Sequence, residues 1–211
     1  MRPTAIPYWI IIFLIFVSCS KDVKIACVGD SITEGSGLEN QSKTAYPAIL
    51  DNILGPGYAV LNCGRSAATL QKAGDLPYWE CKEFYDVFAF NPDVIVIKLG
   101  TNDTKSHNWN YENFKKDYQA LIDTFNTITA NPKIFVCLPV PVFKTMWGIN
   151  DSTLTTAIIP VIKEIAKNND LQVIDLYQSM KDQEENFPDY IHPNEKAAKK
   201  IAEIVAGEIN L

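Results

Sequence analysis

Short apolar runs alternate with longer segments of helical hydrophobic spacing along most of the 211-residue chain. A short unbroken apolar run is typical of a buried strand, and apolar residues three or four positions apart indicate an amphipathic helix. The pattern predicts strands at residues 23–29, 58–63, 93–99, 133–138 and 171–175. It predicts helices at residues 46–54, 78–90, 111–128, 153–168 and 194–209.

Strands that alternate with helices are joined by right-handed crossovers and pair into a parallel sheet. Five strands with helices on both faces make an α/β fold, a three-layer α/β/α sandwich of flavodoxin-like form. In open sheets of this kind the functional residues lie beyond the carboxyl ends of the strands. Neither a linker nor an internal repeat interrupts the pattern, so we expect one domain over residues 19–211.

The N-terminus follows a different pattern. Arg2 precedes an apolar run at residues 8–17, and Ser18 and Cys19 follow it. Such a run is typical of a secretory signal and is shorter than the about 20 apolar residues of a membrane-spanning helix. Residues 16–19 (Phe-Val-Ser-Cys) resemble a bacterial lipoprotein box, in which the Cys becomes the lipidated first residue. We therefore expect a signal peptide at residues 1–18 and an exported protein, anchored to a membrane through Cys19 in the periplasm or at the cell surface. An uncleaved N-terminal anchor is the alternative.

Charge and cysteine content narrow the classes of partner and cofactor. The chain has 19 basic and 25 acidic residues and a net charge of −6, and it has no basic stripe of the kind that nucleic-acid binding requires. Besides Cys19 it has Cys27, Cys63, Cys81 and Cys137, whose spacing does not match a zinc site. We expect no metal and no organic cofactor, and the pairing of these four cysteines stays open.

Polar residues follow three of the predicted strands and precede the last helix, so they should meet at one edge of the sheet. The four stretches are Gly29-Asp30-Ser31, Asn62-Cys63-Gly64, Gly100-Thr101-Asn102-Asp103 and Asp189-Tyr190-Ile191-His192. Together they offer a hydroxyl, an imidazole, a carboxylate, an amide and a glycine. Acyl transfer to a serine needs a nucleophile, a base, a group that orients the base, and donors for the oxyanion.

Each role has one candidate. We expect Ser31 to be the nucleophile, His192 the base and Asp189 the carboxylate that orients the imidazole. The backbone N–H groups of Ser31 and Gly64 and the side-chain amide of Asn102 are the expected oxyanion donors. The two other aspartates of these stretches, Asp30 and Asp103, are expected to hydrogen-bond loop backbone.

The four stretches, in this order, resemble the sequence blocks of the SGNH hydrolases, also called GDSL-type esterases. The resemblance extends over about residues 24–210 and implies an esterase that forms an acyl-enzyme on Ser31. The Gly-Thr-Asn-Asp form of the third block, together with export, implies that the substrate is an O-acetyl ester of a carbohydrate. One position departs from the family pattern: many relatives have a second Gly soon after Gly64, where this chain has Ala67. This difference leaves the shape of that turn open.

Other functions remain open at this stage. A lysophospholipase or thioesterase would use the same residues on longer acyl chains. A non-catalytic glycan-binding surface lipoprotein would have no need of Ser31, Asn102 and the Asp189/His192 pair together. A flavin-phosphate loop would explain the glycines of residues 29–37 and nothing else. Three tryptophans in or near loops either stack on sugar rings or cover the edge of the core; these are Trp79, Trp109 and Trp147.

Overall fold

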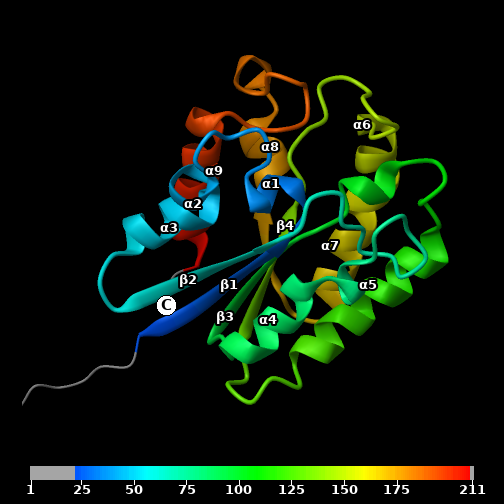
Figure 1. The fold of residues 1–211 in the computed structure, drawn as a ribbon. Helices are drawn as coiled ribbons and strands as arrows, with labels where there is room; N and C mark the ends of the chain where they lie inside the picture. The colour runs from blue at the N-terminus through cyan, green and yellow to red at the C-terminus, as the bar shows by residue number, and fades with distance from the viewer. Residues whose placement is uncertain (1–21, 210–211) are drawn as a thin grey trace, which may run out of the picture.

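One parallel sheet organises the chain (Figure 1). The computed structural model describes residues 22–209, so the predicted signal peptide and Cys19 lie outside the described residues. Within those residues the strand order is β2-β1-β3-β4-β5, and every neighbouring pair is parallel. The strands are β1 (Val23–Gly29), β2 (Tyr58–Gly64), β3 (Val94–Lys98), β4 (Lys133–Leu138) and β5 (Gln172–Asp175). The predicted fold class is confirmed.

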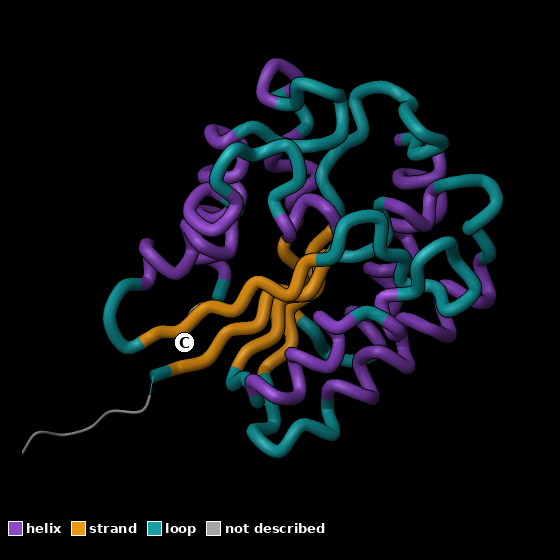
Figure 2. The backbone as a smooth tube through the Cα atoms, viewed as in Figure 1, coloured by secondary structure: helices purple, strands orange, loops and turns teal. Residues whose placement is uncertain are grey.

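Helices cover both faces of the sheet, and most loops gather at one end of it (Figures 1 and 2). The helices of the described residues are α1 (Ser31–Glu34), α2 (Gln41–Thr44), α3 (Tyr46–Leu54), α4 (Lys82–Phe90), α5 (Tyr111–Phe125), α6 (Asp151–Thr153), α7 (Ile159–Asn168), α8 (Leu176–Met180) and α9 (Glu195–Glu208). Short 3-10 turns occur at Tyr78–Glu80, Asn102–Thr104 and Glu184–Asn186, and a π-helical segment at Leu154–Ile158 joins α6 to α7.

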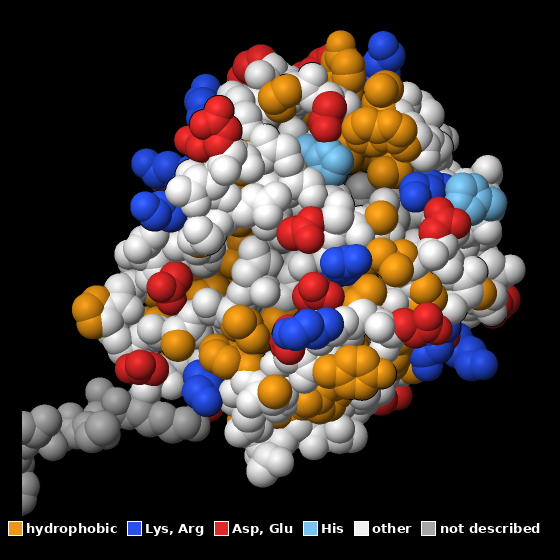
Figure 3. Space-filling model, viewed as in Figure 1, with side chains coloured by type: hydrophobic (Ala, Val, Ile, Leu, Met, Phe, Trp, Pro, Cys, Tyr) orange, Lys and Arg blue, Asp and Glu red, His pale blue; other side chains and the backbone are white. Residues whose placement is uncertain are grey.

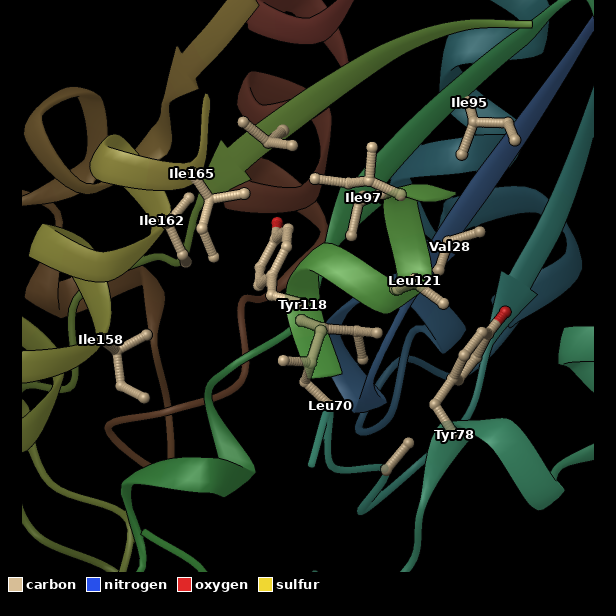
Figure 4. Close-up of a cluster of buried hydrophobic side chains, with 14 of the residues drawn as sticks. Val28, Leu70, Tyr78, Ile95, Ile97, Tyr118, Leu121, Ile158, Ile162 and Ile165 are labelled. Atoms are coloured by element: carbon tan, nitrogen blue, oxygen red, sulfur yellow. The ribbon is translucent and has the colours of Figure 1, made fainter. Parts of the chain in front are cut away.

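Alternate residues of the strands face the two helical layers. In β1, Ala26 and Val28 belong to the apolar cluster under α4, α5 and α7, whereas Ile25 and Cys27 belong to the cluster under α3, α8 and α9. Figure 4 shows part of the first cluster, in which Tyr118 of α5 points toward the strands. A strand that is buried on both faces reads as a nearly continuous apolar run, which explains the pattern in the sequence.

The predicted helix at 78–90 is interrupted at Cys81, which has an extended backbone. Tertiary hydrogen bonds fix the preceding turn separately from α4. Tyr78 Oη donates to the carbonyl of Cys63 at 2.8 Å, and Trp79 Nε1 donates to the carbonyl of Leu70 at 2.9 Å. Both acceptors lie in or beside the loop after β2, so this turn holds that loop in place.

All four cysteines of the described residues are free and buried. The pairing that the sequence left open is therefore resolved for Cys27, Cys63, Cys81 and Cys137, since none of them forms a disulfide. Burial raises the pKa of the Cys137 thiol to about 12, so it is a neutral part of the core. None of the helices within residues 22–209 is long and apolar enough to cross a membrane.

Candidate active site

A tight strand–turn–helix connection positions Ser31. It is the first residue of α1, directly after β1 and the cap residue Asp30, whose Oδ1 accepts the Ile32 N–H at 3.0 Å. Gly29 allows this close turn, because a Cβ there would collide with the Thr33 side chain. The serine is almost fully buried, and it lines a cavity at the surface. The expected structural role of Asp30 is confirmed.

The structure brings the three predicted triad residues together. Ser31 Oγ lies 2.8 Å from His192 Nε2, although the two residues are 161 positions apart. His192 Nδ1 lies 2.6 Å from Asp189 Oδ2. This geometry fits a neutral imidazole whose Nδ1–H donates to the carboxylate and whose Nε2 accepts the serine proton.

Backbone contacts hold the Asp189 carboxylate in place. Its Oδ1 accepts the N–H of Ile191 at 3.0 Å and the N–H of His192 at 2.6 Å. Burial raises the pKa of Asp189, but the hydrogen bonds from His192 and Ile191 outweigh it, and the net direction is downward. The carboxylate is therefore ionised near neutral pH and stabilises an imidazolium.

Asn102 faces the same cavity as the triad. It begins the 3-10 turn after β3, and its Nδ2 donates one hydrogen to the carbonyl of Ala68 at 3.0 Å. The second amide hydrogen has no acceptor within residues 22–209. The cavity has a volume of about 250 Å³, and its lining residues are Ser31, Ser66, Ala67, Asn102, Lys105, Trp147, Ile149 and His192. Figure 3 shows histidine and hydrophobic side chains gathered on this face, near the top of the view.

Gly64 does not join this group, so the prediction that it supplies an oxyanion donor is wrong. Its N–H donates to Asn62 Oδ1 at 2.9 Å, and Gly64 does not line the cavity. A Cβ at this position would collide with the backbone of Glu34 in α1. The glycine is therefore needed for the close packing of β2 against α1 and not for the approach of a ligand.

Ala67, and not Gly64, is a residue of the loop after β2 that lies at the cavity. It lines the cavity, has a left-handed backbone (φ +65°), and makes no hydrogen bond from its N–H to another residue of 22–209. The sequence contains one signal for this residue: Ala67 stands at the position where many relatives have the second Gly of the family pattern. The turn keeps a backbone that favours glycine, although the residue is alanine.

The left-handed alanine has a testable consequence. We expect Ala67→Gly to raise the free energy of unfolding by about 1 kcal/mol, because glycine adopts positive φ without strain. For a domain of this size the melting temperature should rise by about 2–4 °C. The matched control is Ala68→Gly, which removes a fully buried methyl group from the core and should lower the melting temperature. Equal losses in both variants would contradict the strain at Ala67.

A buried carboxylate shapes the loop after β2. The Asp103 oxygens accept the N–H groups of Leu70 and Gln71, each at 2.9 Å. Burial raises the pKa of Asp103 to about 6 against the lowering effect of these hydrogen bonds. The expected structural role of Asp103 is confirmed, since it ties the Ala67 loop to the turn that carries Asn102.

Lys98 is a residue that the sequence analysis missed. Its side chain and that of Asp30 are fully buried, with Nζ 2.8 Å from Asp30 Oδ1 and 3.2 Å from Thr101 Oγ1. The lysine thus joins the turn before Ser31 to the turn before Asn102. Its only signal in the sequence is one basic residue at the end of an apolar strand.

The three tryptophans singled out in the sequence have different places. Trp79 and Trp109 are partly buried against the core under α4 and α5. Trp147 is 62% exposed and lines the cavity, with its ring centroid 6.1 Å from that of His192. Of these three, only Trp147 lies at the site.

Comparisons with known proteins agree with this geometry. Residues 27–200 match the model of the GDSL-like lipase/acylhydrolase family. The chain is 44% identical over 206 residues to an acetylxylan esterase of Xylanibacter ruminicola, covering 89% of this chain and 43% of that protein. It therefore spans less than half the length of this relative.

Solved structures share the fold. An acetyl xylan esterase superposes with a TM-score of 0.71 at 22% identity, covering 89% of this chain and all of the other. A carbohydrate acetylesterase from Sinorhizobium meliloti superposes with a TM-score of 0.69 at 19% identity, covering 89% and 98%. All four sequence blocks lie inside the family match, at residues 29–31, 62–64, 100–103 and 189–192. The chain belongs to the GDSL-like lipase/acylhydrolase family.

Proposed function

We propose that this protein is a serine esterase that removes acetyl groups from a carbohydrate. The observation that carries the proposal is the hydrogen-bonded chain from Ser31 through His192 to Asp189, beside the free amide hydrogen of Asn102. The 44% identity to an acetylxylan esterase supports an acetylated sugar as the substrate class.

The proposed reaction has two halves. Ser31 Oγ attacks the ester carbonyl carbon while His192 Nε2 takes the serine proton. The oxyanion accepts hydrogen bonds from the N–H groups of Ser31 and Ala67 and from Asn102 Nδ2. His192 then gives its proton to the leaving sugar oxygen, and an acetyl-enzyme remains. In the second half His192 Nε2 takes a proton from water as the water oxygen attacks the acetyl carbon. The bond between that carbon and Ser31 Oγ then breaks, His192 returns the proton to Ser31 Oγ, and acetate leaves.

The test uses the full chain with two sets of substrates. We expect Ser31-dependent release of acetate from O-acetylated xylo-oligosaccharides, and a rate on p-nitrophenyl esters that falls from acetate to longer acyl chains. A preference for long chains would favour the lysophospholipase or thioesterase alternative. If a serine-reactive phosphonate fails to label Ser31 and no ester is cleaved, the glycan-binding lipoprotein is the better explanation.

We also propose that the protein is exported and anchored to a membrane by lipid at Cys19. The basic residue, the apolar run and the Phe-Val-Ser-Cys sequence at residues 16–19 support this proposal. Cells that express the full chain should incorporate a labelled fatty acid into it, and Cys19→Ser should abolish the label. Labelling that persists in Cys19→Ser would contradict this site of modification.

A further inference from the structure

Trp147 occupies a turn that a bulky residue seldom adopts. Met146 and Ile149 exchange two backbone hydrogen bonds, of 3.2 and 2.8 Å, across the dipeptide Trp147-Gly148. Both central residues have positive φ, +52° and +82°, as in a type I′ turn. Such turns favour Asn followed by Gly, because a side chain with Cβ is strained there.

The strained backbone at Trp147 is not offset by burial of its ring. The side chain is 62% exposed, one of the most exposed large apolar side chains within residues 22–209. A turn that gives up backbone stability to present an aromatic ring to solvent beside an active site points to a function for the ring.

Two sets of hydrogen bonds hold the loop that carries Trp147. On one side, Asn150 Nδ2 donates to the carbonyl of Thr104 at 2.9 Å, and Asn150 N–H donates to Thr104 Oγ1 at 3.2 Å. Thr104 belongs to the 3-10 turn that begins at Asn102. On the other side, Phe143 N–H donates to the carbonyl of Tyr190 at 3.0 Å, within the segment that carries His192. The loop that carries Trp147 is thus tied both to the turn of Asn102 and to the segment of His192.

The chemistry of the triad decides which half of the ester can reach this ring. His192 Nε2 must protonate the leaving oxygen, so the alcohol lies within about 3 Å of Nε2. The Trp147 ring centroid is 6.1 Å from the His192 ring centroid. The ring of a leaving sugar therefore lies within reach of Trp147. The acyl carbon, in contrast, is bonded to Ser31 Oγ, with its oxygen toward Asn102.

We propose that Trp147 is the platform for the alcohol half of the substrate and that it determines selectivity for a sugar as the leaving group, independently of the acyl group. An aromatic face can stack on the C–H face of a pyranose, and the indole N–H can bond a hydroxyl. The proposal rests on the proposed carbohydrate esterase activity.

The decisive variant is Trp147→Asn, because asparagine suits the first central position of the turn. We expect its melting temperature to equal or exceed that of the wild type. The ratio of kcat/KM for acetylated xylo-oligosaccharide to kcat/KM for ethyl acetate should fall by about tenfold or more, mainly through KM. The ratio for ethyl acetate to ethyl butyrate should stay as in the wild type. Trp147→Tyr should recover most of the sugar selectivity.

Tyr85→Ala is the matched control, since Tyr85 of α4 is 61% exposed and lies outside the cavity. Both ratios should be those of the wild type in this variant. Trp147 would lose the proposed role if the sugar ratio stayed constant in Trp147→Asn. The same holds if the acyl ratio changed as much, or if melting temperature and both activities fell together.

Binding separates this proposal from the proposed function. In a Ser31→Ala background, calorimetry with acetylated xylo-oligosaccharide should show weaker binding when Trp147→Asn is added. If the wild-type chain released no acetate but bound the oligosaccharide through Trp147, the platform would stand and the esterase would fail. If acetate release depended on Ser31 but binding of the oligosaccharide were the same with and without Trp147→Asn, the esterase would stand and the platform would fail.

Discussion

Ser31→Ala is expected to lower kcat for ester hydrolysis by about 10⁵–10⁶-fold, with little change in KM. The substitution removes the oxygen that lies 2.8 Å from His192 Nε2 and leaves the backbone N–H of residue 31 in place. The remaining donors should still accelerate hydrolysis by about 10³-fold over water. Initial rates of acetate release at high enzyme concentration measure the effect.

Two further variants make this test specific. His192→Ala should cost about as much as Ser31→Ala, and the double variant no more, because the two groups act as a unit. Ser36→Ala is the control, since the Ser36 hydroxyl bonds Glu34 and Ser66 and does not contact the imidazole. It should keep a rate near that of the wild type. A Ser31→Ala rate within tenfold of the wild type would refute the nucleophile assignment.

Lys98→Met is expected to lower the free energy of unfolding by about 3–5 kcal/mol. Nζ of Lys98 lies 2.8 Å from Asp30 Oδ1, and both side chains are fully buried. Without the lysine, a carboxylate remains in the core with no cation beside it. The loss is a large fraction of the about 5–15 kcal/mol that stabilises a domain. Urea unfolding of the wild type and the variant gives the difference.

A double variant identifies the cause of that loss. Asp30→Asn combined with Lys98→Met removes both charges, and the Asn side-chain oxygen can still cap the Ile32 N–H. We expect the double variant to be more stable than Lys98→Met alone, because the uncompensated charge is gone. If the double variant were the less stable of the two, the loss would arise from packing or from the Thr101 contact.

The sequence predicted the frame of the fold closely. The observed bounds of β1, α3 and β4 equal the predicted ones, and α9 differs by one residue at each end. These elements have strong local signals: unbroken apolar runs for the strands, and for α3 a Gly-Pro-Gly stop directly after it. The interruption at Cys81 could not be predicted, because it depends on hydrogen bonds from Tyr78 and Trp79 to a distant loop.

The sequence predicted a residue of the candidate site wherever the role needs one particular kind of side chain. Ser31, His192, Asp189 and Asn102 are brought together as expected. Gly64 was chosen because glycine suits a close approach to a ligand, but that glycine is needed for packing against α1. The left-handed backbone of the neighbouring loop is a property of its three-dimensional path, and an alanine in the sequence does not indicate it.

The direction of β1 determines where the ends of the described chain lie relative to the site. The chain enters the sheet at Val23 and reaches Ser31 at the far end of a seven-residue strand, a rise of about 23 Å. α9 starts three residues after His192 and runs back, so both ends of the described chain lie at the end of the sheet away from α1 (Figure 1). A lipid, a cell wall or a further domain that is joined to either end of the described chain is therefore attached at the end of the sheet opposite to the site. A large polysaccharide can therefore approach the cavity without a clash with the group to which the protein is attached.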